Sequence, residues 1–144
     1  MKDMIKNLET ILASTYALAL KTQNYHWNVT SPNFKSLHEL FGTQYDQLAL
    51  AVDEIAERIR VLGPKIEANF GAFDGASKVK NGNKNFTATE MLKDLAASHK
   101  IVVKLLKEGT KISQKHGDEA VADLLITRTE AHEKDIWMIE SSIG

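Results

Sequence analysis

The sequence predicts an all-α protein, a four-helix bundle in which one long crossover carries a short helix. Leu, Ala, Lys and Glu dominate four long segments, and these residue types favour helices. Apolar residues recur in those segments at the three- and four-residue spacing of one helix face. Only two prolines occur, and both lie between such segments. The 144 residues fit a single domain, residues 1–144, better than two.

A short break separates the first two helices. The first helix is predicted from about Lys2 to Val29, where the run Thr30-Ser31-Pro32-Asn33 breaks it. The second is predicted from about Phe34 to Leu62, and Gly63-Pro64 ends it. The apolar stripes expected to face the core are Ile5, Leu8, Leu12, Tyr16 and Ala19 in the first helix, and Phe41, Leu48, Val52, Ile55, Ile59 and Leu62 in the second.

The crossover lies between the second and third long helices. A short helix is expected at Lys65 to Phe73, followed by a polar turn at residues 80–85. One long crossover of this kind is the connection found in ferritin-like bundles, rather than in simple up-down-up-down bundles.

Two further helices complete the bundle. Thr87 and Glu90 fit a capping box that opens the third helix, which is expected to end near His116-Gly117. The fourth is predicted from about Asp118 to Ser142, with acidic residues at its start. The expected core positions are Leu92, Leu95, Val102 and Leu106 in the third helix, and Val121, Leu125, Ile136, Ile139 and Ile143 in the fourth.

Composition excludes several classes of protein. The chain has no cysteine, so disulfides, thiolate metal sites and cysteine nucleophiles are excluded. Lys plus Arg number 18 and Asp plus Glu number 19, which gives no overall attraction to nucleic acid or to an anionic membrane. No apolar run is long enough to span a membrane, and the first residues lack a signal-peptide pattern, so a cytoplasmic protein is expected. Phosphate-binding loops and hydrolase nucleophile motifs are also missing.

Asp53 and Glu57 form an acidic pair on the second helix. Four residues separate them, so they lie on one helix face. The apolar stripe of this helix centres on the opposite side, so the pair is predicted to point away from the subunit's own core. A solvated acidic face is the simpler explanation of such a pair by itself. No Glu-x-x-His motif, which builds the interior metal site of many ferritin-like bundles, occurs in the chain.

His26 and His38 flank the break between the first two helices. Imidazole nitrogens together with carboxylate oxygens make an ordinary set of ligands for ferrous iron. Each histidine by itself is better explained as a partly buried or surface residue, and His26 also continues the apolar stripe of its helix. Carboxylates that face outward cannot meet these histidines inside one bundle. They can meet the histidines of a neighbouring subunit, and a two-fold contact would form the site twice.

These residues resemble the Dps family, the mini-ferritins first described as DNA-binding proteins from starved cells. The resemblance rests on Tyr25-His26-Trp27-Asn28-Val29, on His38-Glu39, and on Asp53-Glu54-Ile55-Ala56-Glu57-Arg58. The spacing His-x11-His-x14-Asp-x3-Glu is the family's ferroxidase signature. The closing run Ile136 to Ser142 also resembles the end of the family's last helix, so the similarity covers nearly the whole chain.

The resemblance implies a ferroxidase and iron-storage function. Family members form a shell of twelve subunits that oxidises Fe(II) at two-fold interfaces and stores Fe(III) as a mineral. They usually prefer hydrogen peroxide to dioxygen as the oxidant, which protects against oxidative stress. Carried over by position, His26 and His38 would come from one subunit, and Asp53 and Glu57 from its partner, as catalytic residues and metal ligands.

Three more residues acquire expected roles from the resemblance. Trp27, next to His26, matches the family's tryptophan near the iron, a plausible electron donor. Asp118 and Asp123 match acidic residues of the three-fold pores that admit iron. Ordinary acidic charge at a helix N-terminus explains these two aspartates equally well.

The chain departs from the family pattern at Gly42. Many members carry an acid four residues after the second histidine, where it assists a second metal. Glycine removes that ligand and costs a helix interior roughly 1 kcal/mol relative to alanine. The second iron position is therefore expected to be weak, or to be helped by Asp46 on the same outward face as Asp53.

A second departure concerns DNA. Members that bind DNA tightly often use a flexible lysine-rich tail, and no such run is present at either end of this sequence. Non-specific affinity for DNA needs several phosphate contacts. Many weak lysine patches on a shell could still bind at low salt. We expect weak or no DNA binding at physiological salt.

Three function classes follow. They are an iron-oxidising storage enzyme, a nucleoid protein that mainly compacts DNA, and a stress-related shell that has lost efficient ferroxidase activity. The signature residues favour the first class, and Gly42 keeps the third open. No metal role is predicted for His99, His116 or His132, and Phe41 and Trp137 are predicted to be packing residues.

Overall fold

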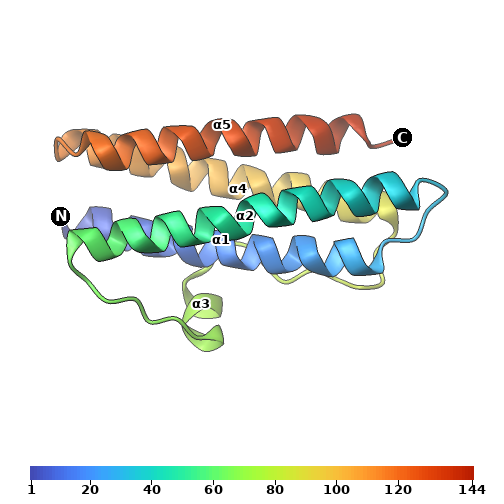
Figure 1. Ribbon diagram of the computed structural model, residues 1–144, viewed down its shortest axis with the longest axis horizontal. Helices are drawn as coiled ribbons and strands as arrows, with labels where there is room; N and C mark the ends of the chain where they lie inside the picture. The colour runs from blue at the N-terminus through green and yellow to red at the C-terminus, as the bar shows by residue number, and fades with distance from the viewer.

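The computed structural model describes residues 1–144 and confirms the predicted all-α class. Its five helices are α1 (Lys2–Asn28), α2 (Phe34–Leu62), α3 (Phe70–Ala76), α4 (Ala88–Lys115) and α5 (Glu119–Ser141). The four long helices form the bundle, and the crossover that carries α3 returns the chain along it, so that α2 and α4 run in the same direction (Figure 1). None of these helices is long and apolar enough to cross a membrane.

The short helix of the crossover lies further along the chain than predicted. Lys65 to Phe73 was the expected span, whereas α3 begins at Phe70 and ends at Ala76. The reason is Asn69, whose side chain accepts the backbone N–H of Ala72 and thereby caps the helix. The predicted polar turn is present, and within it Phe86 N–H donates to the Asn83 carbonyl.

The ends of α4 and α5 follow the local capping chemistry of the sequence. Thr87 accepts the N–H of Glu90, and the Glu90 carboxylate accepts the N–H of Thr87, so the capping box is complete. These hydrogen bonds lower the pKa of Glu90. Asp118 caps α5 by accepting the N–H of Val121 at 3.0 Å. The capping residues Thr87 and Asp118 thus predicted where α4 and α5 begin.

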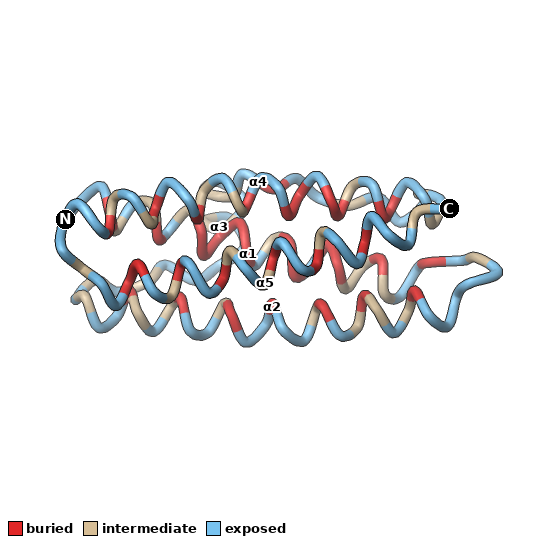
Figure 2. The backbone as a smooth tube through the Cα atoms, turned by 90° about the horizontal axis from the view of Figure 1, so that it is seen from above, coloured by how far each residue is buried: buried red, intermediate tan, exposed pale blue.

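The apolar stripes of the four long helices meet in one core (Figure 2). Ile5 and Ile136 of the predicted stripes are only partly buried and lie outside the core cluster, and Tyr16 and Trp137 are exposed. The Tyr16 residue is 37% exposed and lies against the ring of Phe73, whereas Trp137 is 65% exposed on α5. Phe41 is fully buried, as predicted. The largest fully buried side chains include Tyr25, Phe41, Met4, Leu8, Ile11, Leu12, Leu18, Leu48, Ile55, Ile59, Met91 and Leu95.

A polar network joins α1 to α4 and to the crossover. The buried Lys21 ammonium lies 3.1 Å from the Asp94 carboxylate and donates to the Ser98 hydroxyl at 2.9 Å. The Tyr25 hydroxyl donates to Asp94 and accepts the backbone N–H of Asn83. Burial and the bond to Asp94 raise the pKa of Tyr25. This network holds the end of α1 that carries His26.

Candidate metal site

His26 and His38 meet where α1 ends and α2 begins. His26 lies in the last turn of α1, and His38 lies one turn into α2. The short link between the helices folds them side by side, and the buried Val29 anchors that link to the core. The two imidazole rings stack with their centroids 3.8 Å apart and their planes 12° from parallel.

Reciprocal hydrogen bonds fix the tautomer of both rings in their neutral form. His26 Nδ1 lies 2.6 Å from the His38 carbonyl oxygen, and His38 Nδ1 lies 2.7 Å from the His26 carbonyl oxygen. A carbonyl can only accept, so each Nδ1 carries the proton and donates it. Each Nε2 therefore has a lone pair. A histidine whose Nδ1–H is held by a carbonyl and whose Nε2 is free is the usual arrangement of a metal ligand.

The bond from His38 also completes helix α1. The last four carbonyls of a helix have no helical N–H to accept, and the His26 carbonyl is one of them. The His38 ring supplies the missing donor. On its other side, Phe34 stacks on the His38 ring with a centroid distance of 5.1 Å. The geometry of the imidazole pair is thus set by the join between the two helices.

Asp53 and Glu57 lie exposed on α2, away from the subunit's core, as the periodicity of that helix predicts. The pKa of Glu57 is raised, first by a hydrogen bond shared with the Asp53 carboxyl and then by the negative charge of that group. A cation bound between two such carboxylates would reduce their electrostatic repulsion.

A single chain does not bring the four predicted ligands together. Asp53 follows His38 by fifteen residues on the same helix, which corresponds to roughly 22 Å along its axis. No group of three or more His, Asp or Glu side chains in the chain is close enough to hold a metal ion. Asp46 is exposed on α2 between His38 and the Asp53–Glu57 pair, about 12 Å along the helix from His38. The chain thus presents one imidazole half-site and one carboxylate half-site.

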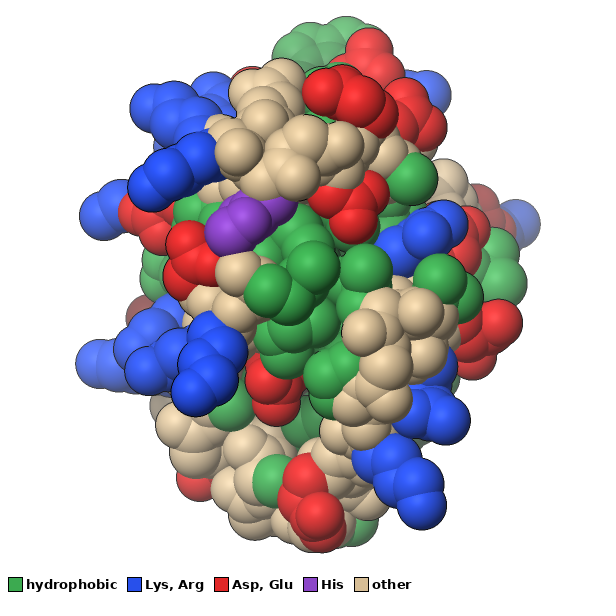
Figure 3. All heavy atoms as spheres, turned by 90° about the vertical axis from the view of Figure 1, so that its left-hand side faces the viewer, with side chains coloured by type: hydrophobic (Ala, Val, Ile, Leu, Met, Phe, Trp, Pro, Cys, Tyr) green, Lys and Arg blue, Asp and Glu red, His purple; other side chains and the backbone are tan.

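The two aspartates compared with pore residues differ in their surroundings. The Asp118 side chain is used as the N-cap of α5. Asp123 is exposed and lines a surface hollow together with Glu54 and Glu57. At the end of the bundle where α5 begins, acidic and basic side chains surround an apolar patch, and neither sign of charge is segregated (Figures 1 and 3).

The interior of the bundle holds a chain of buried cationic and neutral groups. The Arg128 guanidinium donates to His132 Nε2 at 3.1 Å, so the proton of His132 lies on Nδ1. That Nδ1–H donates to His99 Nδ1 at 2.8 Å, which leaves the His99 proton on Nε2, where it has no partner. Burial, followed by the charge of Arg128, lowers the pKa of His99 to about 3. The pKa of His132 is also lowered, mainly by burial.

This chain of hydrogen bonds leaves no lone pair for a metal. Every acceptor nitrogen of the two buried histidines already receives a proton from a neighbour, and the remaining nitrogen carries its own. The bundle centre, where many ferritin-like proteins hold metal, is therefore occupied by Arg128 and neutral imidazoles.

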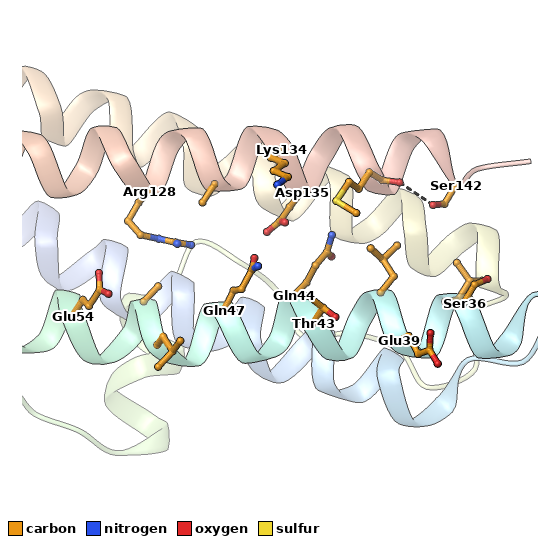
Figure 4. Close-up of a pocket in the computed structure, with 16 residues that line it drawn as sticks. Ser36, Glu39, Thr43, Gln44, Gln47, Glu54, Arg128, Lys134, Asp135 and Ser142 are labelled. Atoms are coloured by element: carbon orange, nitrogen blue, oxygen red, sulfur yellow. Dashed lines mark hydrogen bonds between the residues drawn. The ribbon is translucent and has the colours of Figure 1, made fainter.

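A cavity of about 800 Å³ lies between α2 and α5, and Arg128 of the hydrogen-bonded Arg128–His132–His99 group lines it. Gln44 points into it from α2, and Arg128 and Asp135 point into it from α5 (Figure 4). Neither amide atom of Gln44 has a protein partner, and burial raises the pKa of Asp135 to about 6. This cavity was not predicted from the sequence. Its one sequence signal is that Gln44 falls within the apolar stripe of α2, between Phe41 and Leu48.

The chain resembles known proteins over almost its whole length. The family model described as the ferritin-like domain matches residues 5–144. DNA protection during starvation protein 2 of Bacillus anthracis is 33% identical over 143 residues, covering 99% of this chain and 98% of the relative. The DNA protection during starvation protein of Brevibacillus brevis is 32% identical over 146 residues, covering 98% of each. The crystal structure of Dps from Staphylococcus aureus superposes with a TM-score of 0.96 and 30% identity, covering 100% of this chain and 97% of that one.

Proposed function

The chain belongs to the Dps family of the ferritin-like superfamily, and we propose that it is the subunit of a shell that oxidises and stores iron. Proteins of this family are stress-related, protect DNA and commonly act as ferroxidases. The observation that carries the proposal is the His26–His38 pair. Its reciprocal hydrogen bonds use both Nδ1 atoms and leave two Nε2 lone pairs free to bind a metal. Packing of the two rings does not require these free lone pairs.

We propose that the site is completed between two subunits. A two-fold axis through the middle of α2 would place the carboxylates of one subunit against the imidazoles of the other, because the half-sites lie on either side of that middle. An apolar groove lies there, and it is lined by Tyr45, Ala49 and Val52 of α2 together with residues of α1 and by the exposed ring of Phe70. Apolar surface between the two half-sites favours contact with a second copy of the chain.

In the proposed reaction, iron is the substrate. Two imidazole nitrogens from His26 and His38 and carboxylate oxygens from Asp53 and Glu57 suit ferrous iron. Each ferrous ion gives up one electron, so two ions reduce one molecule of hydrogen peroxide, with two protons, to two molecules of water. Trp27 is 62% exposed beside His26, and we assign it as an electron donor near the site. Dioxygen is the alternative oxidant.

Storage requires a closed shell and a route for the ion. We propose the twelve-subunit assembly of the family, with the ferric mineral inside. Of the two aspartates proposed for the pore, Asp123 is the freer, since the Asp118 carboxylate caps α5. Asp123 shares a surface hollow with Glu57, whose lining also includes the basic Arg58.

Iron oxidation by mixed shells tests the proposal. One variant carries His26→Ala and His38→Ala, and the other carries Asp53→Ala and Glu57→Ala. Each should oxidise ferrous iron no faster than buffer after anaerobic loading and addition of peroxide. Shells co-assembled from both variants regain intact sites if the ligands come from two subunits. The matched control is Glu108→Ala, which removes an exposed carboxylate of α4 with no partner in the chain and should leave the rate unchanged.

Absorbance of the ferric product and the size of the particle that carries it are the readouts. Recovery of a soluble, protein-associated ferric core in the mixed shells would support a site shared between subunits. Loss of activity without recovery on mixing would count against the shared site, and full activity in either parent variant would count against the ligand assignment.

A DNA-protecting shell with weak or lost ferroxidase activity is the second candidate. The names of the similar Bacillus anthracis and Brevibacillus brevis proteins favour it, and Gly42 does so by removing an acidic ligand. Oxidation by the unaltered shell at the rate of buffer, with retardation of DNA by the same preparation, would make this the better description.

A further inference from the structure

Gly42 lies against the imidazole ring of His26. A Cβ atom built on this glycine would stand 2.9 Å from His26 Cε1 and 3.1 Å from His26 Nδ1. The first distance is shorter than real Cβ contacts, and the second is at the tight end of their range. The ring therefore occupies the space in which any other residue at position 42 would begin its side chain.

The geometry of an α-helix explains why this position matters for the imidazole pair. Side chains of a helix lean toward its N-terminus and cover the turn that precedes them. A side chain at position 42 would accordingly cover the carbonyl of His38, one turn earlier. That carbonyl is the oxygen that accepts the Nδ1–H of His26 at 2.6 Å.

We infer that Gly42 is a positioning residue for the metal site, acting through His26. The missing side chain opens the His38 carbonyl to the His26 ring, and the resulting bond keeps the proton on Nδ1 and turns Nε2 outward. This inference rests on the proposed function, because it gives Gly42 a role in the same site. Under this inference Gly42 orients His26, whereas the sequence comparison with the family indicates only that an acidic ligand is missing at this position.

Helix stability does not explain the glycine. Glycine in a helix interior is less favourable than alanine by roughly 1 kcal/mol, and no positive φ is required at this position. The contact is with the far end of a side chain that can rotate. A methyl group at position 42 should therefore displace the His26 ring without disrupting the helix.

Gly42→Ala in the full shell is the test, with Gly75→Ala as the matched control. Gly75 lies in α3, and nothing stands within 4 Å of its added Cβ. In a crystal structure of metal-free Gly42→Ala we expect the distance between His26 Nδ1 and the His38 carbonyl to exceed about 3.5 Å, the limit of a hydrogen bond. Thermal unfolding should be unchanged or should move to higher temperature.

Binding of Co²⁺, followed by the visible absorption of the bound ion, gives the second readout. Loss of a group that orients a ligand typically weakens metal affinity by about 10- to 100-fold, and we expect a loss in that range for Gly42→Ala and none for Gly75→Ala. If Gly42 acts through His26, the substitution should have no further effect in a His26→Ala shell.

The outcomes separate this inference from the proposed function. Weak or absent Co²⁺ binding by the unaltered shell would count against the proposed site, while the ring position in metal-free Gly42→Ala still decides the role of the glycine. An unmoved His26 ring, or equal Co²⁺ affinity in the unaltered and Gly42→Ala shells, would overturn the positioning role. An additive loss in the His26→Ala background would do so as well.

Discussion

Each imidazole of the candidate site donates a hydrogen bond from its Nδ1–H and leaves its Nε2 free. The Nδ1–H of His38 satisfies the carbonyl of His26, which has no helical donor, whereas the carbonyl satisfied by His26 lies inside α2. In a regular helix that second carbonyl also accepts an N–H from the next turn. The two bonds have the same geometry but different consequences, because only the bond from His38 supplies a donor that the backbone lacks.

Substituting the two histidines should expose this difference at the level of stability. We expect His38→Ala to lower the free energy of unfolding by about 1 kcal/mol, because it leaves the end of α1 uncapped. His26→Ala should cost less, because the His38 carbonyl keeps its helical partner. Denaturant unfolding of both variants without metal gives the comparison. Equal losses would mean that capping contributes nothing beyond ring packing.

Residue types and spacing indicated the histidines and carboxylates, but not how they are held. The positions of Asp53 and Glu57 opposite the apolar stripe of α2 were sufficient to predict their outward direction. The stacking of His26 on His38 depends on how the link at residues 29–33 folds, and sequence periodicity says nothing about a link. Gly42 was conspicuous only as a missing acid, because its contact is with a ring from another helix.

At the scale of secondary structure, α1 and α4 are tied together by a buried ion pair. Lys21 is 3% exposed and Asp94 is 27% exposed, and Asp94 also accepts the Tyr25 hydroxyl. A buried charge that loses its partner is left without solvation. The bridge between Lys100 and Glu140 joins α4 to α5 with both side chains about half exposed, so water replaces a lost partner there.

Neutralising one partner in each pair should give very different results. Asp94→Asn should lower the free energy of unfolding by about 3 kcal/mol, because it strands the Lys21 ammonium in the interior. Glu140→Gln should change it by less than about 1 kcal/mol. Thermal or denaturant unfolding of the two variants is the measurement. Similar effects for both would show that water reaches Lys21.

The helices themselves followed from the sequence where local chemistry decides their ends. The start of α4 was predicted from Thr87 and Glu90, and the end of α2 from Gly63 and Pro64. Both predictions agree with the structure to within one residue. The crossover helix was misplaced because its start is set by the side chain of Asn69, which the prediction did not treat as a cap. Tyr16 was misassigned to the core because periodicity gives a direction but not the depth to which a side chain is covered.

For the whole subunit, the buried histidines predict a dependence of stability on pH. The pKa of His99 is about 3 in the folded chain against an ordinary value of 6.5, so the unfolded chain binds the extra proton between these values. Stability from His99 is fully present above pH 6.5 and is lost as the pH falls toward 3. Asp135, with a pKa near 6, acts in the opposite direction between 3.8 and 6.

We therefore expect the subunit to lose stability between pH 7 and pH 5. His99 alone contributes a loss on the order of 2 kcal/mol, His132 adds to it, and Asp135 offsets part of it. Denaturant unfolding at the two pH values measures the change, and His99→Gln, which stays neutral, should flatten it. A stability that rises on acidification would mean that Asp135 outweighs both histidines.

The net charge of the chain and the distribution of its charged side chains affect how strongly it can bind DNA. Formal charge is −1 per chain, and positive and negative side chains are interspersed on the end of the bundle shown in Figure 3. Retention of DNA by such a surface depends on many weak phosphate contacts. We expect a gel shift, if present at low salt, to disappear at physiological salt. A retarded band at physiological salt and micromolar protein would contradict this expectation.

The hydrogen bond by which His38 closes the end of α1 would link occupancy of the proposed metal site to local folding. A cation held at Nε2 withdraws electrons from the ring and makes its Nδ1–H a stronger donor to the His26 carbonyl. By mass action, an ion that binds only the closed hairpin suppresses its transient opening. Amide hydrogens in the last turn of α1 and in the link that follows should then exchange with solvent more slowly as free ferrous iron rises. The join between the first two helices would thereby report the occupancy of the proposed metal site.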